Sequence, residues 1–420
     1  MRLTLSQIRK FFLVLFFVVL AGGIGYRLGE RKISLELSST SPLVKINRVV
    51  PANKQGKVDF DLFWKVWDKL EAKYLDKESL DYQKMVYGAI SGLVSSLGDP
   101  YTFFLPPSEN KESKDDLRGD FEGVGIQIGY NKEKRIVVVA PLAGTPAEKA
   151  GVKSGDIILR IVDEKNKVDK ETSEMTLSEA VQLIRGPKGT KVKLSLLREG
   201  KEEPFEVELV RDTIVVKSVE VKFEEKNGKK VALLTLSRFG ERTYDEWQEA
   251  VDLIKKEEKN SGKNFKGIVL DLRNNPGGFL QGAVFIASEF LAKGVVVQQD
   301  QGQLGKETYS VDRKGNLLTE PLVVLVNSGS ASASEIVAGA LQEAKRAKLV
   351  GEKTFGKGTV QEAEDLEGGA GLHVTIARWL LPSGKSIDKE GVKPDVVIKN
   401  DEQDESKDLQ LEKAIEMLII

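Results

Sequence analysis

The sequence lacks cysteine and has a single histidine among its 420 residues. Disulfides, thiol nucleophiles and lipid-modified cysteines are therefore excluded, and so are zinc sites built from cysteine and histidine. Any chemistry that needs two histidines is excluded with them. We expect neither a metal ion nor another cofactor in this protein.

A charge excess of either sign is also missing, because 63 lysines and arginines stand against 64 acids, for a net charge of −1. Phosphate binding needs a positive excess, so nucleic acid is not expected as the main partner. The apolar fraction of 40% and the charged fraction of 30% are typical of a soluble globular composition. At about 150 residues per domain, the length predicts two or three domains.

Residues 11–25 (FFLVLFFVVLAGGIG) form an uncharged apolar run that follows Arg2, Arg9 and Lys10, the usual layout of an export signal. The run is short against the roughly 20 residues that span a bilayer, so a cleaved signal peptide and an uncleaved anchor both stay open. We favour a single membrane anchor within residues 1–30, followed by a linker over residues 31–57. The catalytic part of the chain is then expected outside the cytoplasm, in the periplasm or at the cell exterior.

Residues 58–112 are predicted to form an N-terminal helical region. Apolar residues recur near helical spacing over residues 59–75, and a second helix is expected over 82–97, where Gly98-Asp99-Pro100 ends it. The aromatic side chains of the first helix fit helix packing or a dimer contact better than a ligand site.

Residues 113–212 have a different sequence pattern, in which short runs of strand-forming residues are bounded by turn residues. One short helix is expected over 177–184, before Gly186-Pro187. The predicted strands are residues 136–140, 157–162, 191–198 and 205–210. The pattern indicates a small β domain.

Residues 213–400 alternate strands with helices, which predicts an α/β core. The strands expected here are continuously apolar, as in a sheet covered on both faces. They are residues 231–236, 267–272 and 322–326, and the helices are residues 244–258, 280–292 and 334–346. The C-terminal segment, 401–420, ends in a short amphipathic helix that either packs on its own domain or takes part in a homodimer contact.

Two loops in this core each follow a buried strand directly, residues 271–278 (DLRNNPGG) and residues 327–335 (NSGSASASE). In open α/β sheets, functional residues are concentrated in the loops that follow the carboxyl ends of the strands. Serine is also a common helix N-cap, so Ser332 or Ser334 could serve only to begin the next helix. Taken alone, the second loop leaves both interpretations open.

Lys357 lies between two glycines in residues 351–361 (GEKTFGKGTVQ). Glycine lets this lysine come close to backbone, and its long stem can be buried. Because burial disfavours the ammonium, such a lysine can be neutral near pH 7 and take a proton from a serine. A solvated loop lysine is the alternative, and it is favoured when Lys357 is considered alone.

Taken together, residues 271–278, 329–335 and 354–361 resemble the motifs of the carboxyl-terminal processing peptidases, also called tail-specific proteases. The resemblance extends from about residue 59 to residue 398, and the three motifs occur in the family's order. It implies a crotonase-like α/β protease core with an inserted β-rich PDZ domain and an N-terminal helical region, behind the membrane segment.

The resemblance also assigns roles to single residues. It implies that Ser332 is the nucleophile, Lys357 the base and Gln361 the residue that helps to orient the lysine. The oxyanion hole would consist of the backbone N–H groups of Gly278 and Ala333, a preorganised pair that favours the transition state.

Residues 121–128 (FEGVGIQI) look like the carboxylate-binding loop of a PDZ domain, with support from residues 141–152 and 154–158. Successive N–H groups of a glycine loop can hold a C-terminal carboxylate while the peptide adds a strand. The residues expected to contact such a tail are Gly123, Val124, Gly125, Ile126 and Arg185. In some family members an arginine at the position of Arg185 couples tail binding to a competent active site, and a solvated helix-end arginine is the equally weighted alternative.

These features predict a serine endopeptidase that recognises apolar C-terminal tails of protein substrates and cleaves them through an acyl-enzyme. One alternative is a catalytically silent, membrane-tethered PDZ scaffold, which loss of Ser332 or Lys357 would have favoured. Another is a crotonase-like acyl-CoA enzyme, which neither the PDZ domain nor the Ser-Lys pair would serve. His373, in an alternating strand over 371–379, is expected to be a strand residue and not a triad base.

Overall fold

The computed structural model describes residues 59–131, 133–201, 203–400 and 407–419. The chain divides into two units, Met1–Asp81 and Tyr82–Ile420. The predicted membrane anchor and the linker that follows it lie outside the described residues. Within the described ranges, none of the helices combines the length and the apolar character that a membrane span requires.

The described part of the first unit contains helix α2 (Asp61–Lys73) and a 3-10 turn, η2 (Lys77–Ser79). The helix predicted over 59–75 is therefore present. Its aromatic rings contact one another: the ring centroids of Phe63 and Trp64 are 4.9 Å apart, and those of Trp64 and Trp67 are 6.2 Å apart. The aromatic spacing thus produces packing along the helix, as expected.

The second unit begins with helix α3 (Tyr82–Ser95), followed by strand β1 (Phe103–Leu105) and helix α4 (Pro107–Arg118). Helix α4 was not expected, because its sequence is almost entirely polar and has no apolar periodicity. Its end signals are nevertheless clear. Proline stands at its first position, and Gly119 ends it in the left-handed conformation with φ of 77°.

A small β domain follows, and it contains every strand predicted between residues 136 and 210. Its antiparallel sheet has the order β3-β4-β5-β7-β8, with β6 paired to β5. The strands are β3 (Ile126–Tyr130), β4 (Ile136–Pro141), β5 (Ile157–Asp163), β6 (Val168–Glu171), β7 (Lys191–Leu197) and β8 (Phe205–Val210). Helix α5 (Pro146–Lys149) and helix α6 (Leu177–Ile184) complete it, and a capping box between Thr176 and Glu179 begins α6.

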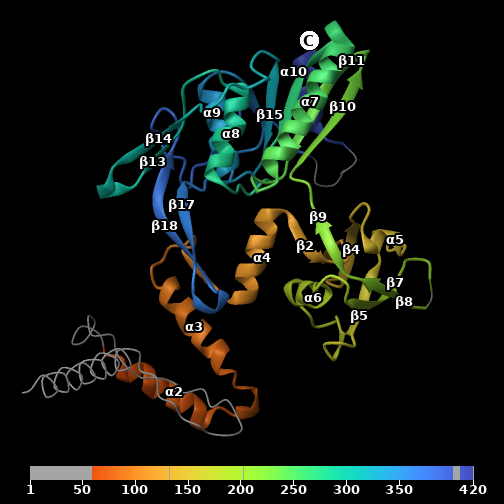
Figure 1. Cartoon of the computed structure of the whole chain (residues 1–420), viewed down its shortest axis with the longest axis vertical. Coiled ribbons are helices and arrows are strands. Elements are labelled where there is room, and N and C mark those ends of the chain that lie inside the picture. The colour runs from red at the N-terminus through yellow and green to blue at the C-terminus, as the bar shows by residue number, and fades with distance from the viewer. Residues whose placement is uncertain (1–58, 132, 202, 401–406, 420) are drawn as a thin grey trace, which may run out of the picture. The chain divides into compact units, whose positions relative to one another are not determined.

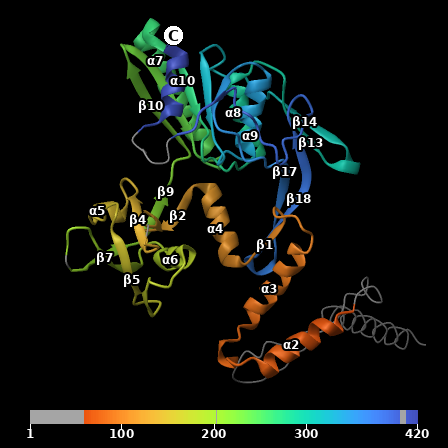
Figure 2. The ribbon, with the colours of Figure 1, turned by 180° about the vertical axis from the view of Figure 1, so that it is seen from behind.

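The segments that lead into and out of this domain lie next to each other, because β2 (Asp120–Gly123) pairs antiparallel with β9 (Asp212–Val215). The domain is therefore an insertion between α4 and the α/β core, connected through two adjacent strands (Figures 1 and 2).

The α/β core is built on a six-stranded sheet with the order β10-β11-β12-β15-β16-β19. All neighbouring pairs from β11 to β19 are parallel. The strands are β10 (Val219–Lys226), β11 (Lys229–Leu236), β12 (Phe265–Asp271), β15 (Leu322–Val326), β16 (Lys348–Gly351) and β19 (Val396–Val397). The three continuously apolar strands predicted from sequence are β11, β12 and β15, and they lie next to one another.

Both faces of this sheet are covered, which explains the apolar runs. Helices α7 (Thr243–Ser261), α8 (Leu280–Phe290) and α9 (Ala333–Glu343) pack with Leu234 and Leu270 in one core. Helix α10 (Leu409–Ile419) packs against Val269 and Leu325 in another. Because side chains alternate along a strand, neighbouring residues of β12 enter the two different cores. The amphipathic C-terminal helix thus covers its own domain.

A second sheet, whose paired strands are all antiparallel, was only partly anticipated. It contains β13 (Val295–Asp300), β14 (Lys306–Ser310), β17 (Thr359–Asp365) and β18 (Gly371–Leu380), with β1 as an edge strand. The strand predicted around His373 is β18. Pairing of β1 with β18 places Phe103 opposite His373 and so brings the segment after α3 to the core.

Candidate active site

The three motifs of the core meet because they follow neighbouring parallel strands. Asp271 at the end of β12 lies opposite Leu325 of β15, and Val326 lies opposite Gly351 of β16. The carboxyl ends of parallel strands lie at one edge of a sheet, so the loops that leave them converge. We call residues 271–278 the glycine loop, residues 327–335 the serine loop and residues 352–358 the lysine loop.

Ser332 differs from the other serines of the serine loop. Ser330 and Ser334 are buried, and their hydroxyls donate to Leu272 O (2.8 Å) and Asn275 O (2.9 Å). Ser332 is only partly buried, and its hydroxyl donates to none of the described residues. Its backbone has φ of 56° and ψ of −117°, a conformation that is rare for a residue with a side chain. Strain of this kind concentrates at functional sites.

The glycine loop approaches Ser332 closely. A Cβ atom on Gly277 would lie 2.8 Å from Ser332 Cβ, and one on Gly278 would lie 2.1 Å from Phe239 O. The N–H of Gly277 donates to Asn275 Oδ1 at 2.9 Å. The N–H groups of Gly278 and Ala333 donate to none of the residues that the structure describes. The structure therefore brings two backbone donors without a protein acceptor to the loops beside Ser332.

Lys357 is held mainly by its backbone. Its N–H donates to Glu335 Oε2 at 2.9 Å, and its carbonyl accepts from Trp379 Nε1 at 2.7 Å. Its Nζ lies 5.2 Å from the ring centroid of Tyr101. Burial lowers the pKa of the Lys357 ammonium, although the negative charges of Asp99 and Glu335 oppose this shift. In the described part of the chain, no hydrogen bond joins Lys357 Nζ to Ser332.

Glu335 ties the serine loop to the lysine loop. This fully buried carboxylate accepts hydrogen bonds from the Ser332 N–H (2.9 Å), the Lys357 N–H (2.9 Å), the Gly356 N–H (2.7 Å) and the Thr354 hydroxyl (2.5 Å). Burial raises its pKa, and these hydrogen bonds act against that rise. Sequence analysis gave Glu335 no role. The available signal was an acid three residues after a serine at a helix start, a capping-box pattern.

Asp99 and Tyr101 also reach this site, although Gly98-Asp99-Pro100 was interpreted only as a helix end. Asp99 accepts from the Tyr101 N–H (3.0 Å) and from the Thr102 hydroxyl (2.7 Å). Burial raises the pKa of Asp99, but hydrogen bonds from Thr375, Thr102 and Tyr101 outweigh it, so the net shift is downward. Only the pairing of β1 with β18 brings this segment here, so no local pattern could have shown it.

Gln361 and His373 lie on the adjoining sheet. The Gln361 amide donates to the hydroxyls of Thr359 (2.8 Å) and Thr375 (3.1 Å), and within the described ranges it makes no hydrogen bond with Lys357. The His373 ring stacks on Phe103 with 4.6 Å between centroids. Burial, and secondly the charge of Lys357, lower the pKa of His373. His373 is thus a half-buried strand residue, as expected.

Four of the five predicted tail-binding residues line a separate groove of the β domain, and Gly123 is not among its lining residues. The groove has a volume of about 230 Å³ and is lined by Phe121, Val124, Gly125, Ile126, Gln127, Ile128, Val181, Ile184 and Arg185. Strand β3 is an edge strand of its sheet, so its outer side is open to an added strand. Gly125 has φ of 77°, and a Cβ atom there would lie 2.3 Å from Thr145 Cβ.

Comparison with known proteins agrees with this arrangement. The sequence model of peptidase family S41 matches residues 230–398, and that of the PDZ domain matches residues 113–197. The carboxy-terminal processing protease CtpA of Bacillus subtilis is 36% identical over 93% of this chain and 77% of its own length. The carboxyl-terminal-processing protease of Synechocystis is 39% identical over 84% of this chain and 81% of its own length. The chain belongs to peptidase family S41, with the carboxy-terminal processing proteases.

A solved structure from Bacteroides fragilis, described as an S41 protease, shares the fold alone. It has a TM-score of 0.54 at 17% identity, over 84% of this chain and 96% of its own. Membership of S41 confirms that the chain is a serine-type peptidase with a PDZ domain, and it disfavours the silent scaffold. The assignment of roles to single residues is not tested by these similarities and stays a prediction.

Arg185 connects the PDZ groove of this S41 peptidase to α4. Its guanidinium lies 4.4 Å from the ring centroid of Phe121 and 3.2 Å from Glu112 Oε1. Helix α4 in turn accepts a hydrogen bond from Arg238 Nη1 at Asp116 O. Arg238 directly precedes Phe239, whose backbone is hydrogen bonded to Gly277 and Phe279. The contacts form a continuous path from the tail groove to the glycine loop.

Proposed function

We propose that this S41 peptidase binds the apolar C-terminal tail of a protein substrate in its PDZ groove and cleaves the chain with Ser332 as nucleophile and Lys357 as base. One observation carries the proposal. Among the described residues, the hydroxyls of Ser330 and Ser334 each donate a hydrogen bond to a backbone carbonyl, whereas the hydroxyl of Ser332 donates none. Glu335 accepts from the backbone N–H groups of both Ser332 and Lys357.

The chemistry follows from the protonation state of the lysine. Neutral Lys357 takes the proton of the Ser332 hydroxyl as its oxygen attacks the scissile carbonyl carbon, and the resulting oxyanion accepts hydrogen bonds from the Gly278 and Ala333 N–H groups. The lysine ammonium then gives its proton to the leaving amine, which leaves an acyl-enzyme. A water molecule hydrolyses the ester while Lys357 takes and returns the proton again.

The reaction needs a hydrogen bond between Ser332 and Lys357 that this conformation does not contain. We propose that tail binding beside Arg185 favours the conformation in which the bond forms, through α4 and Arg238. A ligand can shift such an equilibrium only by its differential affinity for the two states. The ion pair between Arg185 and Glu112, directly at the groove, is a contact that a bound tail can alter.

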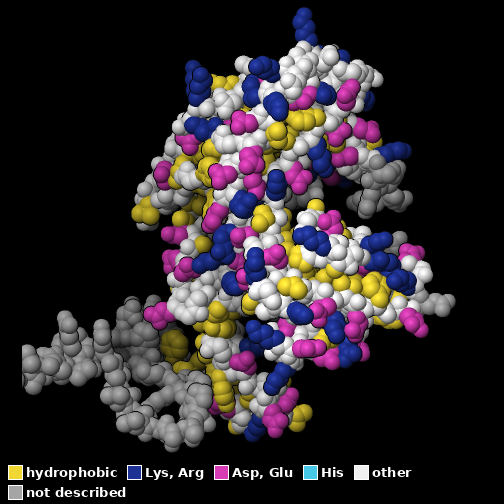
Figure 3. All heavy atoms as spheres, turned by 45° about the vertical axis from the view of Figure 1, so that its right-hand side comes forward, with side chains coloured by type: hydrophobic (Ala, Val, Ile, Leu, Met, Phe, Trp, Pro, Cys, Tyr) yellow, Lys and Arg dark blue, Asp and Glu magenta, His cyan; other side chains and the backbone are white. Residues whose placement is uncertain are grey.

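Substrate choice by a chain end also fits the surface charge. Basic and acidic side chains are interspersed over the face drawn in Figure 3, without a field of one sign. A partner held by one carboxylate and a few apolar side chains needs no such field. We further propose that residues 1–30 anchor the chain to a membrane with the catalytic part outside the cytoplasm.

Cleavage of a purified protein with an unstructured apolar tail tests the proposal. The parent should shorten it, whereas Ser332→Ala and Lys357→Ala should each lower the rate at least about 10³-fold, as loss of a nucleophile or base does. Ser328→Ala and Lys353→Ala are matched controls, because both side chains are exposed on the same two loops and should retain activity. Parental activity in Lys357→Ala would refute the assignment of the base.

The PDZ role is tested separately by amidating the terminal carboxylate of the substrate. The amide should raise KM, because the glycine-rich N–H groups then lack an anion to bind. If KM and kcat are both unchanged, the β domain does not recognise the chain end.

A further inference from the structure

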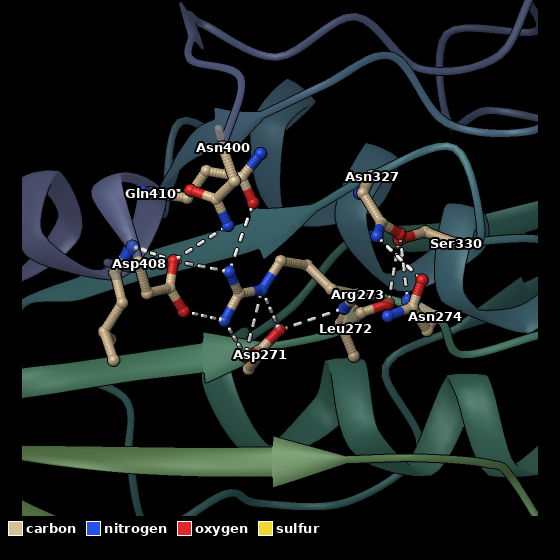
Figure 4. Close-up of polar contacts among 10 residues, drawn as sticks. Asp271, Leu272, Arg273, Asn274, Asn327, Ser330, Asn400, Asp408 and Gln410 are labelled. Carbon is tan, nitrogen blue, oxygen red and sulfur yellow. Dashed lines mark hydrogen bonds and ion pairs between the residues drawn. The ribbon is translucent and has the colours of Figure 1, made fainter. Parts of the chain in front are cut away.

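The glycine loop is held from a second side, away from Ser332, by the C-terminal segment. Figure 4 shows the guanidinium of Arg273, on the glycine loop, between the carboxylates of Asp271 and Asp408. The Arg273 side chain is 14% exposed. Asp271 accepts from Nε and Nη2, the shortest of these distances being 2.6 Å. Asp408, which directly precedes α10, accepts from Nη1 and Nη2 at 2.8 Å each.

Both oxygens of Asp408 accept from Arg273, but only Oδ1 also caps α10. Oδ1 accepts from Arg273 Nη1, from the Leu411 N–H in the first turn of α10 (3.0 Å) and from Asn400 Nδ2 (3.2 Å). Oδ2 accepts from Arg273 Nη2 alone among the described residues. Asp408 therefore caps α10 and binds the glycine loop at the same time, and replacing Oδ2 weakens its contact with Arg273 without removing the cap.

The charges make this contact strong. Burial alone would lower the pKa of Arg273, but its hydrogen bonds to Asp271 and Asp408 outweigh burial and raise that pKa. Burial would raise the pKa of Asp408, and its bond to Arg273 turns the net shift downward. Bidentate arginine-carboxylate pairs are both stronger and more restrictive in geometry than single hydrogen bonds.

On its other side the glycine loop is bonded to the serine loop. The Asn274 N–H donates to Asn327 Oδ1 (2.9 Å), and Asn327 Nδ2 donates to Asn274 Oδ1 (2.8 Å). These two side chains point toward each other in Figure 4. Asn274 has φ of 56°, in the left-handed region that asparagine adopts more readily than most residues. The loop is thus bonded on one side to Asp408 and on the other to the serine loop.

We propose that Asp408 is a positioning residue for catalysis: through Arg273 it holds the glycine loop, and with it the Gly278 N–H, in the geometry that receives the oxyanion. The inference rests on the proposed function, because it takes Gly278 as an oxyanion donor. It makes the docking of the C-terminal helix a condition for full activity, although α10 contributes no group to the reaction.

The test uses Asp408→Asn in the full chain. The asparagine oxygen can still cap α10, since asparagine is a good N-cap. The substitution removes the negative charge that faces the guanidinium, and the amide nitrogen replaces Oδ2, which cannot then accept from Arg273 Nη2. We expect kcat on the tailed substrate to fall about ten-fold or more with KM within two-fold, because loss of one oxyanion donor costs about 10² to 10³. Asp395→Asn is the matched control: its carboxylate bonds Leu349 and Lys348 of the same sheet, away from the glycine loop, and kcat should change less than two-fold.

Hydrogen exchange followed by mass spectrometry supplies a readout that does not need cleavage. In Asp408→Asn, made in the Ser332→Ala background, exchange should accelerate in residues 272–279 and not in α7. Acceleration confined to residues 409–419, or a kcat within two-fold of the parent, would overturn the proposal.

If the asparagine variant does not fold, Asp408→Ser keeps a helix cap without the ion pair between Asp408 and Arg273, which we call the clamp, and is subject to the same criteria. A parent that never cleaves, together with the expected exchange pattern, would refute the proposed function and leave the clamp standing.

Discussion

In the proposed mechanism, the environment of Lys357 determines when the base is available. Lys357 is partly buried, which favours the neutral amine, but Asp99 and Glu335 favour the ammonium. The balance between these terms determines the pH at which the base becomes available. Substitution of either acid should therefore change the pH dependence of the reaction.

Asp99→Asn should move the acid limb of the kcat/KM profile to lower pH. Removing a negative charge disfavours the ammonium, so the pKa of Lys357 falls and the neutral base is present at a lower pH. The profile should be measured on the tailed substrate beside Glu362→Gln, which removes an exposed acid on β17 and should leave the limb in place. An unchanged or upward-shifted limb in Asp99→Asn would mean that Lys357 is not the group that titrates.

Gly278→Ala should inactivate the enzyme without preventing binding. The added Cβ would lie 2.1 Å from Phe239 O, and the φ of 138° disfavours any side chain, so the loop has to shift. We expect kcat to fall about 10²-fold or more, with little change in the affinity of the PDZ groove for a tail peptide. Gly88→Ala, at a helical position with open space around it, is the control and should retain kcat.

At the scale of elements, helix α4 lies between the PDZ groove and the α/β core. Its acids pair with Arg185, and its last turn bonds Arg238 and Glu241. The helix is polar along its length, and those polar side chains make its connections to the elements beside it. These contacts support the proposed coupling role of α4.

Arg185→Ala should uncouple tail binding from cleavage. The variant loses the ion pairs to α4 and the stack on Phe121, so a bound tail no longer biases the core. We expect stimulation of cleavage by the tail to fall about five-fold or more, the lower end of typical coupling energies. Lys188→Ala serves as the control, since that nearby basic side chain pairs with Asp212 and not with α4. Equal stimulation in both variants would exclude Arg185 from the path.

The stability of the whole molecule depends on the apolar core between the parallel sheet and helices α7, α8 and α9. Trp247 is fully buried there, contacts Phe290 edge to face and donates from Nε1 to Glu289. Loss of the Trp247 side chain leaves a cavity, and it removes one hydrogen-bond donor from the buried carboxylate of Glu289. This position therefore measures core stability separately from catalysis.

Trp247→Ala should lower the free energy of unfolding by about 3–5 kcal/mol, as large-to-small core substitutions do. Leu253→Ala, on the same helix but 49% exposed, should change it by less than about 0.5 kcal/mol. Urea unfolding followed by circular dichroism measures both. Equal effects of the two substitutions would contradict the placement of α7 on the sheet.

Much of the fold could be predicted because its elements follow local patterns. The apolar strands β11, β12 and β15 and the short helix α6 were expected within a residue or two of their ends. Helix α4 was missed because it has no apolar face to mark its period. Most of the second sheet was missed because its strands are half-exposed and pair across long separations, as β1 does with β18.

The sequence by itself determined the reaction class, because three of its motifs resemble those of the carboxyl-terminal processing peptidases. That resemblance implied a serine peptidase, and the pairing of Ser332 with Lys357 stays a prediction. Only the tertiary structure decided which groups surround that pair. It distinguishes Ser332 from the two buried serines, and it brings Asp99, Glu335 and Asp408 to the same three loops. The physical reason is that hydroxyl accessibility and the pairing of buried charges depend on the order of strands in a sheet, which no local pattern contains.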